Sequence, residues 1–389
     1  MFVDRLLNRY FLISLLVIFL SHLTFKTMQE KSFASFKELF LYLLSILLAY
    51  LVTHYKIIPA LIKINIRQGL FGKDIYLKGT PDFDTKIAEC LGIGCAVAFF
   101  GHMLFMYAFF RMEEKAYQYE IISHVLGYIV FGTFLGFVDD VLELRWRDKL
   151  VYPFMFSILI IFNYEGDTRL HFPLIIEELI GIESINLSWL FYLYLILICI
   201  FCVNSINIYA GISGLEVGQS FIIGLTMMIE SLYCYLNDDA AKQNMMALLI
   251  LGPFCAVSFS LLRFNKVEAK TFVGDTYCYF AGCVLAACGI ISKSPIKLLF
   301  FFIPQLFNFI LSLPQLFGYV FCPRHRLPKM DLKTKKMHTT FPTNLNLVNF
   351  MLYVTGPLNE QQLGNVLLAL QVLTNSIVIM VLRYLQFKQ

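Results

Sequence analysis

Long apolar runs dominate this chain and are separated by short polar segments. An apolar run of about 20 residues crosses a bilayer as a helix, because a helix satisfies its own backbone hydrogen bonds in hydrocarbon. The mean hydropathy is +0.70, and only 15% of the 389 residues are charged. We therefore predict an all-α polytopic integral membrane protein with about ten transmembrane helices and an extra N-terminal helix. The runs lie at 10–25, 38–59, 91–110, 121–138, 150–163, 188–206, 219–235, 245–263, 277–291, 296–320 and 363–385.

The first run, 10–25, follows Arg5 and Arg9 and could be taken for a secretory signal. No small-residue cleavage site follows it, so we expect the helix to be retained. This divides the chain into an N-terminal extension, residues 1–37, and a membrane-embedded domain, residues 38–389.

Five polar connections should emerge on one face of the membrane if the runs from 38–59 onward alternate across it. They lie at 60–90, 139–149, 207–218, 264–276 and 321–362, and they carry most of the lysines and arginines. By the positive-inside rule this face is cytosolic. The ten cysteines lack disulfide or zinc-ligand spacing, so we interpret them as small apolar packing residues. We expect lipid around the apolar runs and no nucleic-acid partner.

The second of these connections follows the apolar run at 121–138. Residues 137–149, which contain this connection, have the sequence FVDDVLELRWRDK. Asp139 and Asp140 offer hard oxygens, whereas Arg145, Arg147 and Lys149 can neutralise phosphate charge. Such charges are costly in hydrocarbon, which places them at a membrane face or in a wet cavity. The segment predicts phosphate chemistry; the alternative is a polar loop that only fixes topology.

Two further connections offer a neutral and a charged oxygen. Asn207 ends an apolar run and precedes Gly211 and Gly214, which would let backbone amides approach a nucleotide. Asp275 begins a later run, and Phe272 just before it could stack on a base. Asn207 and Asp275 together suit Mg²⁺, with phosphate oxygens completing an octahedron. The alternatives are an amide bonded to a helix carbonyl and a carboxylate that caps its own helix.

The last connection contains CPRHRLPK, in which two arginines flank a histidine between two prolines. Prolines stiffen the backbone, and arginine binds phosphate oxygens in a bidentate manner. We predict a phosphate clamp at Arg324, His325 and Arg326, although a topogenic basic cluster would look similar. Glu89 lies just before a run, where an acid is also ordinary at a helix start.

Five segments taken in order resemble one family. They are GLFGKD, FVDDVLELRWRDK, NSINIYAGISGLEVGQS, FVGDTYCYFAG and CPRHRLPK. The set is similar to the eukaryotic UDP-N-acetylglucosamine–dolichyl-phosphate N-acetylglucosaminephosphotransferases, within the glycosyltransferase family 4-like polyprenyl-phosphate phosphoglycosyltransferases. The CPRHR element favours the eukaryotic enzymes over bacterial relatives that act on undecaprenyl phosphate.

The resemblance implies transfer of GlcNAc-1-phosphate from UDP-GlcNAc to dolichyl phosphate, with release of UMP, as the first step of N-glycan precursor assembly. It also implies about ten spans in the endoplasmic-reticulum membrane, a cytosolic active site, dependence on Mg²⁺ (with Mn²⁺ as a substitute), sensitivity to tunicamycin and a homodimer. Related enzymes that use another UDP-sugar or polyprenyl phosphate remain an alternative.

Roles carried over by the resemblance fall on positions that match the family's motifs. Asn207 and Asp275 match metal ligands, and Lys149 matches the lysine that holds the pyrophosphate. Asp139 and Asp140 match the acidic pair beside the acceptor phosphate. The remaining positions match contacts to the nucleotide sugar: Glu89, Gly211, Ser213, Phe272, Arg324, His325 and Arg326. The family commonly has Asn where Ser213 stands, and it differs at Glu143 and Asp148 as well.

Two other functional classes stay open from the residues alone. A polytopic transporter could hold intramembrane Asp, Asn and Gly, but its site usually lies near the midplane, whereas these polar clusters recur at the ends of runs. An inactive scaffold is the other alternative. For an enzyme, we favour direct attack by the acceptor phosphate, with Asp139 orienting or deprotonating it, over a covalent intermediate on an aspartate.

Overall fold

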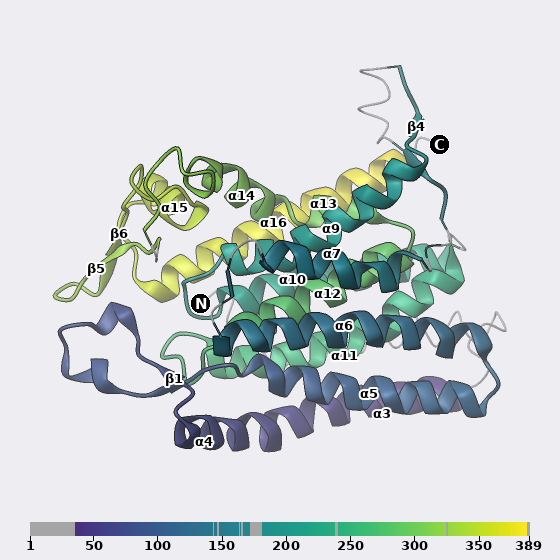
Figure 1. Cartoon of the computed structure of the whole chain (residues 1–389), viewed down its shortest axis with the longest axis horizontal. Coiled ribbons are helices and arrows are strands. Elements are labelled where there is room, and N and C mark those ends of the chain that lie inside the picture. The colour runs from purple at the N-terminus through teal and green to yellow at the C-terminus, as the bar shows by residue number, and fades with distance from the viewer. Residues whose placement is uncertain are drawn as a thin grey trace.

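The structure is a computed structural model that describes residues 36–386 except 143, 146–147, 163, 165, 172–180, 238–239 and 324–325. The helix predicted at 10–25 lies outside the described residues. The described chain is a bundle of roughly parallel and antiparallel helices with three short hairpins at its ends (Figure 1).

Each of the ten apolar runs from 38–59 onward forms helix. The elements are α3 (Phe36–Val52), the π-helical η1 (Thr53–Ile57), α4 (Ile58–Gln68), α5 (Gly92–Met112), α6 (Ala116–Leu142), α7 (Asp148–Ile161), α9 (Trp189–Ile208), α10 (Leu215–Leu236), α11 (Ala241–Asn265), α12 (Gly274–Ile291), α13 (Pro295–Phe301), α14 (Ile303–Leu316), α15 (Leu347–Thr355) and α16 (Glu360–Gln386).

Eight helical stretches in the described part of the chain are long and apolar enough to cross a membrane, or nine if the bent pair α13 and α14 counts as one span. The run at 150–163 differs from the expectation. Its helix, α7, has only 14 residues, which is shorter than the roughly 20 that a full crossing needs. The run at 296–320 is broken, because α13 and α14 meet at an angle of 73°.

The strands are minor elements of this fold. Each hairpin is a two-stranded antiparallel pair: β1 (Phe71–Gly72) with β2 (Ile87–Ala88), β3 (Arg169–His171) with β4 (Ser184–Asn186), and β5 (Lys329–Asp331) with β6 (Lys336–His338). Two short 3₁₀ helices, η2 (Ile75–Leu77) and η3 (Pro81–Asp84), lie between β1 and β2.

Helix α12 is the centre of the bundle, and every residue from Thr276 to Ile290 is buried. It is rich in Ala, Cys and Gly, and small residues allow helices in membranes to approach closely. At Gly282 an added Cβ would lie 2.5 Å from the Cα of Val203 in α9. Nine of the ten cysteines are free and buried, and only Cys322 is exposed, which agrees with their prediction as packing residues.

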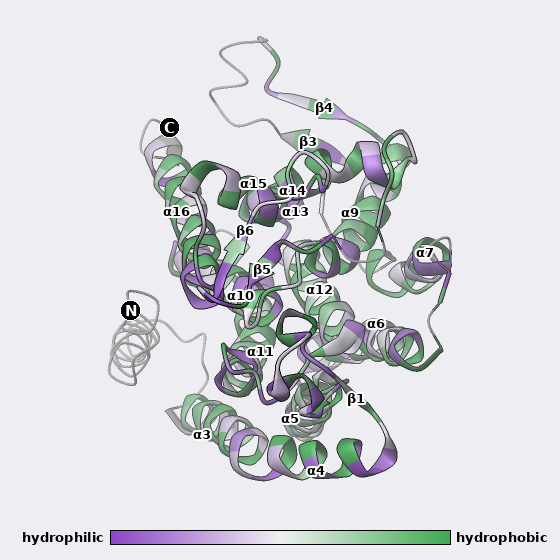
Figure 2. Ribbon diagram, turned by 90° about the vertical axis from the view of Figure 1, so that its left-hand side faces the viewer, coloured by the Kyte–Doolittle hydropathy of each residue, from purple (hydrophilic) through white to green (hydrophobic). Residues whose placement is uncertain are grey.

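The five polar connections gather at one end of the bundle, as the alternation of spans predicts. Figure 1 shows β1, β5 and β6 at this end, on the left. Figure 2 views the molecule from there and shows hydrophilic stretches near β5, β6 and the end of α10, with mainly apolar helices around them. Contacts between the connections join them into one site: Ala88 pairs with Thr271, and the Gly211 loop lies against Leu327.

Candidate active site

A lysine between two carboxylates forms the charged centre of this end of the bundle. The Nζ of Lys149, at the start of α7, lies 2.6 Å from Oδ2 of Asp139 in α6 and 3.2 Å from Oδ2 of Asp275 in α12. The Asp139 side chain is only 1% exposed, whereas those of Lys149 and Asp275 are 22% and 25% exposed. Lys149 and Asp275 are thus the members that a ligand can reach.

The charge on Lys149 is secured by its partners. Burial by itself lowers the pKa of an ammonium group, but the carboxylates of Asp139 and Asp275 outweigh it and raise the pKa of Lys149 above its usual value. Asn204 on the last turns of α9 adds a contact, because its Nδ2 donates to the carbonyl of Lys149 at 3.4 Å. Lys149 therefore stays cationic at neutral pH and is held at a fixed place.

Asp140 has a different task from its neighbour Asp139. Its Oδ1 accepts from the backbone amide of Asp275 at 2.7 Å, and its Oδ2 accepts from the amide and the hydroxyl of Thr276 at 3.0 and 2.5 Å. The first turn of a helix has amides without partners, and it favours negative charge. Asp140 thus caps α12 from another helix. Its oxygens are engaged there, so Asp140 positions the turn that carries Asp275, and its role beside the acceptor phosphate stays a prediction.

Two glycines make this cap sterically feasible. Gly274 has φ +73°, in the left-handed region, and an added Cβ would lie 2.3 Å from Oδ2 of Asp140. At Gly136, one turn before Asp140, an added Cβ would lie 2.7 Å from the carbonyl oxygen of Asp275. Helix α6 can therefore approach the start of α12 only because both positions lack a side chain.

Glu89 and Phe272 form one edge of the site. The amide of Phe272 donates to the carbonyl of Ala88 at 2.8 Å, which ties the segment before α12 to strand β2. Both side chains lie beside Gly72, where an added Cβ would be 2.2 Å from Oε1 of Glu89 and 3.3 Å from Cδ2 of Phe272. Burial, and then the nearby Asp140 carboxylate, raise the pKa of Glu89 above its usual value.

The loop between α9 and α10 is held rigid by acidic side chains. The amide of Gly211 donates to Oε1 of Glu216 at 3.3 Å, and the amide of Ser213 donates to Oε1 of Glu360 at 2.9 Å. The amide of Gly214 donates to Oδ1 of Asn265 at 3.1 Å. These amides are engaged within the chain, which corrects the expectation that Gly211 and Gly214 expose amides to a nucleotide. The loop instead presents its glycine backbone surface.

Residues that the sequence analysis did not assign therefore hold this loop. Glu216 and Glu360 bond its amides, and the hydroxyl of Tyr76 in η2 donates to the carbonyl of Gly211 at 2.8 Å. Glu360 begins the last span, where an acid is an ordinary residue. Its link to Ser213 joins positions 147 apart in the chain, so no local pattern could have revealed it.

The last connection brings Arg326 to the site, while Arg324 and His325 lie outside the described residues. The backbone carbonyl of Arg326 accepts from Nδ2 of Asn346 at 2.7 Å, which fixes the loop. Burial lowers the pKa of the Arg326 guanidinium, although that group remains cationic at neutral pH. Leu327 follows directly, and its Cδ2 would lie 2.6 Å from a Cβ at Gly211. Arg326 is thereby placed beside the α9–α10 loop.

An apolar cavity of about 560 Å³ lies between α6 and α7, and two of its lining residues adjoin Asp139. Val138, which lines it, directly precedes Asp139, and Leu144, also in its wall, donates its amide to Oδ1 of Asp139 at 3.0 Å. The other lining side chains include Phe131, Phe134, Tyr152 and Met155, which are all more than 40% exposed. The cavity is therefore open on the side of the bundle that faces lipid, and an acyl or isoprenoid chain would fit its chemistry.

The donor set at this site fits Mg²⁺ only in company with a substrate. Within the described residues, no three or more His, Cys, Asp or Glu side chains are grouped so as to hold a metal ion. Mg²⁺ commonly binds one or two protein oxygens and completes its shell with substrate phosphates and water. Asp275 offers a partly exposed carboxylate, and Asn207 lies on the last turn of α9, which packs against α12. Asn207 and Asp275 could hold the ion together with a diphosphate.

Comparison with known proteins finds a match that includes the residues of this site. The sequence model described as glycosyl transferase family 4 matches residues 121–293, which include Asp139, Lys149, Asn207 and Asp275. A relative from Dictyostelium discoideum, named UDP-N-acetylglucosamine–dolichyl-phosphate N-acetylglucosaminephosphotransferase, is 39% identical over 82% of this chain and 82% of its own length. The protein of that name from Saccharomyces cerevisiae is 32% identical over 83% of this chain and 86% of its own. The chain belongs to this family of N-acetylglucosaminephosphotransferases.

More distant members of glycosyl transferase family 4 share less of the chain. A phospho-N-acetylmuramoyl-pentapeptide-transferase from Caldicellulosiruptor bescii is 26% identical over 45% of this chain and 53% of its own length. In this chain, Glu89 and Arg326 fall outside the residues that the family 4 model matches. The lysine and carboxylate centre therefore lies within the matched region, whereas Glu89 and the last loop lie outside it.

Proposed function

We propose that this protein transfers GlcNAc-1-phosphate from UDP-GlcNAc to dolichyl phosphate, giving GlcNAc-pyrophosphoryl-dolichol and UMP. The observation that carries the proposal is the Asp139–Lys149–Asp275 centre beside an apolar cavity, to which it is linked by the hydrogen bond from the amide of Leu144 to Asp139. Such a site can hold a phosphate and the chain attached to it at the same time.

The acceptor is proposed to lie along α6 and α7. Its isoprenoid chain would enter the cavity beside Phe131 and Met155, and its phosphate would reach the exposed part of Lys149. An aliphatic chain gains free energy from an apolar groove, whereas its phosphate needs a cation at the membrane face. The cavity and the cation meet beside Leu144.

The donor is proposed to lie across the α9–α10 loop. The ring of Phe272 and the backbone of Gly211 are proposed to contact the uridine. The guanidinium of Arg326, whose Nη1 donates to the carbonyl of Leu345 at 3.4 Å, is proposed to bind the diphosphate with its remaining donors. Glu89 is proposed to contact the sugar of the donor. Ser213 donates its amide to Oε1 of Glu360, and its side chain also hydrogen-bonds that carboxylate. Roles for Arg324 and His325 stay predictions.

Mg²⁺ is proposed to be held by Asn207 and Asp275, and when bound it would supply the charge neutralisation that a phosphate needs to approach a diphosphate. Lys149 adds a fixed positive charge at the same place, in a setting where buried charges act more strongly than in water. Asp140 contributes indirectly, because it fixes the turn that carries Asp275.

We infer direct attack by the acceptor. A phosphate oxygen of dolichyl phosphate would form a bond to the β-phosphorus of UDP-GlcNAc, and the bond from that phosphorus to the bridging oxygen would break, so that UMP leaves. A phosphate monoester has a second pKa of about 6, so at neutral pH the acceptor needs no base. The side chain of Asp139 is 1% exposed and bound to Lys149, which argues against Asp139 as a nucleophile or base. Its proposed role is to hold Lys149.

The cellular setting follows from charge and from the reaction. The protein is a multi-pass membrane protein, and the end that carries the site also carries most of the lysines and arginines. We propose that this end faces the cytosol and that the membrane is the endoplasmic reticulum. The homodimer stays a prediction.

The test is a double-label transfer assay on the purified full-length protein. UDP-GlcNAc labelled with ¹⁴C in the sugar and ³²P in the β-phosphate is incubated with dolichyl phosphate, with Mg²⁺ or with EDTA. We expect both labels in the lipid product at an equal ratio, UMP as the released nucleotide, and no product with EDTA. Asp275→Asn should abolish product while the protein remains folded by thermal unfolding.

Other outcomes would change the proposal in defined ways. Sugar label without ³²P in the lipid, and release of UDP, would mean glycosyl transfer instead of phosphosugar transfer. Preference for UDP-GalNAc, UDP-glucose or undecaprenyl phosphate would replace one substrate and keep the chemistry. Phosphosugar trapped on Asp139 after incubation without acceptor would overturn direct attack.

A further inference from the structure

A chain of buried amides joins three helices behind the site. Gln305, in the first turn of α14, donates its Nε2 to Oε1 of Gln219 in α10 and to Oε1 of Gln371 in α16, each at 2.7 Å. All three side chains are fully buried. Gln371 continues the chain to Asn375 at 2.9 Å, and Asn375 donates to Thr226 at 3.0 Å. Buried polar side chains are costly in a membrane bundle, so a continuous chain of them requires a reason.

One end of this amide chain reaches the turn that carries Asn207. Gln219 donates its Nε2 to the carbonyl oxygen of Tyr209 at 2.7 Å and to that of Ile206 at 3.4 Å. The last carbonyls of a helix lack partners within it and must find others. Because the two carbonyls lie on either side of Asn207, Gln219 fixes the backbone from which that side chain projects.

The same helix, α14, holds the loop that carries Arg326. Gln315 donates its Nε2 to the carbonyls of Phe321 and Thr343 at 2.9 and 3.0 Å, and it accepts the amide of Leu345 at 2.8 Å. Asn308 accepts the amide of Leu347 at 2.8 Å. One polar stripe on α14 thus bonds Gln219 near its start and the last loop near its end.

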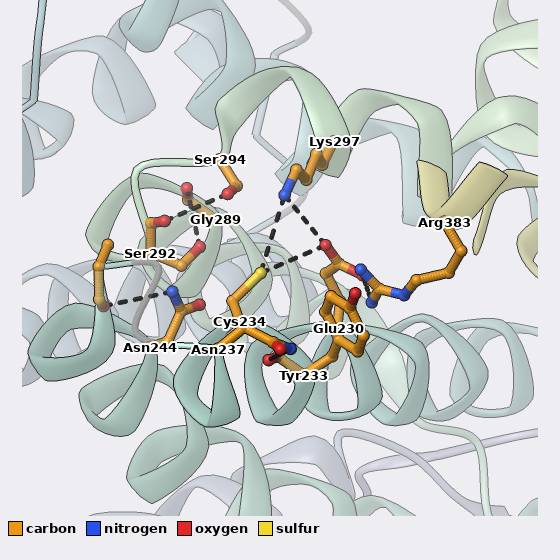
Figure 3. A network of polar contacts seen from close by, with 11 residues as sticks. Glu230, Tyr233, Cys234, Asn237, Asn244, Gly289, Ser292, Ser294, Lys297 and Arg383 are labelled. Atoms are coloured by element: carbon orange, nitrogen blue, oxygen red, sulfur yellow. Dashed lines mark hydrogen bonds and ion pairs between the residues drawn. The ribbon is translucent and has the colours of Figure 1, made fainter. Parts of the chain in front are cut away.

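The break before α14 is fixed from two sides. Gln371 donates to the carbonyl of Phe301, the last residue of α13, at 2.9 Å. Before the break, Lys297 of α13 and Arg383 of α16 both form ion pairs with the buried carboxylate of Glu230 in α10, the former at 3.0 Å (Figure 3). Helix α13 is therefore held near its start by Glu230 of α10 and at its last residue by Gln371 of α16, which fixes the point from which α14 departs.

We propose that Gln219 and Gln305 are positioning residues that set the distance between Asn207 and the loop carrying Arg326. The inference rests on the transfer reaction proposed above, in which both groups act on the diphosphate of one donor. Neither glutamine touches substrate. Reacting groups that are displaced by about 1 Å can lose roughly 10²-fold in rate, so a fixed separation has a direct consequence for catalysis.

The test compares Gln219→Leu and Gln305→Leu with Asn375→Leu as the matched control. Asn375 is also a buried amide of the same chain, but its hydrogen bonds are to Gln371 and Thr226 instead of to the end of α9. For the full-length protein in detergent, the dissociation constant of Mn²⁺ is measured by electron paramagnetic resonance in the presence of UDP. The KM for UDP-GlcNAc, kcat and the thermal unfolding temperature are measured alongside.

We expect Gln219→Leu to weaken Mn²⁺ binding about tenfold, the loss typical when a group that supports a metal ligand is removed. Gln305→Leu should weaken it less and should raise the KM for UDP-GlcNAc as well, because it frees α14. Asn375→Leu should lower the unfolding temperature by a similar amount and leave Mn²⁺ binding unchanged. If Gln219→Leu does not fold, the test compares Mn²⁺ binding and the unfolding temperature of Gln305→Leu with those of Asn375→Leu.

Equal weakening by Asn375→Leu would overturn the inference, since the effect would then be one of general packing. Unchanged Mn²⁺ binding and kinetics in both glutamine variants would also overturn it, while an active wild type would leave the proposed function standing. A wild type that makes no labelled product would instead refute the proposed function, and this inference with it.

Discussion

Asp140 offers the sharpest test of how this site is built, because its sequence neighbour Asp139 is chemically identical. The perturbation is Asp140→Asn, which keeps the shape of the side chain and replaces one oxygen by an amino group. Asp140 accepts three hydrogen bonds from Asp275 and Thr276. Whichever way the amide is oriented, its amino group must face at least one backbone amide of the first turn of α12.

The size of the effect follows from those bonds. A buried donor without a partner costs about 1–3 kcal/mol, and loss of a negative charge at a helix start costs about 0.3–1 kcal/mol. We expect Asp140→Asn to lower the free energy of unfolding by roughly 2–4 kcal/mol. Displacement of Asp275 should lower kcat by about 10²-fold.

Thr276→Val is the matched control, since it removes only the hydroxyl bond to Asp140 and keeps both amide bonds. It should cost about 1–2 kcal/mol and lower kcat by less than roughly fivefold. The loss of stability in the double variant should be smaller than the sum of the two single losses, because both substitutions remove the same hydrogen bond. Product formation and thermal unfolding of the purified variants give the two readouts.

The opposite pattern would refute this reasoning. If Asp140 touched the reacting phosphates, Asp140→Asn would abolish activity while leaving the unfolding temperature unchanged or higher. Additive effects of Asp140→Asn and Thr276→Val would likewise show that the cap to α12 is not what the carboxylate provides.

Three further predictions concern charge and the acceptor cavity. Lys149→Met should destabilise the protein by about 3–5 kcal/mol, because it leaves Asp139 buried without its cation. Adding Asp139→Asn to this variant should restore the unfolding temperature but not turnover. Recovery of activity in the double variant would contradict a role for Lys149 in the reaction. The pKa of Glu89 is raised above 4.5 in the folded chain, so above pH 4.5 the native state binds more protons than the unfolded state. The free energy of unfolding therefore falls as pH rises through the raised pKa. Glu89→Gln should therefore leave thermal stability unchanged below pH 4.5 and raise it at pH 7, and a lower stability at pH 7 would show that the carboxylate is favourably bonded. Met155→Trp, in the wall of the cavity, should raise the KM for dolichyl phosphate about tenfold and leave the KM for UDP-GlcNAc unchanged. If wild type and variant have equal KM values for isoprenyl phosphates, whether the isoprenyl chain is long or short, the acceptor chain lies elsewhere.

The helices and their common polar end could be predicted from the sequence because the bilayer leaves few choices. A long apolar run must be helical in hydrocarbon, and its ends fix where polar connections emerge. Two runs depart from this expectation for reasons that hydropathy does not register. Helix α7 stops after 14 residues, and the run at 296–320 bends by 73° between α13 and α14, where Gln371 bonds the carbonyl of Phe301.

The sequence singled out Asp139, Lys149 and Asp275, and the structure brings these three side chains together. Which group bonds which could not be predicted from the sequence. Successive residues of a helix point about 100° apart, so Asp139 meets Lys149 whereas Asp140 meets the start of α12. The amides of Gly211 and Gly214 were expected to face a nucleotide, but they donate to Glu216 and Asn265.

The sequence by itself determined that this chain is a polytopic helical membrane protein with most of its lysines and arginines at one end, because hydropathy and charge act residue by residue. Only the tertiary structure decided which polar group serves which purpose. Gln219, Gln305 and Gln371 come from three helices, and each would be an unexplained polar residue in its own span. Their pairing depends on how α10, α14 and α16 pack, and packing is a property of the whole bundle that no single segment encodes.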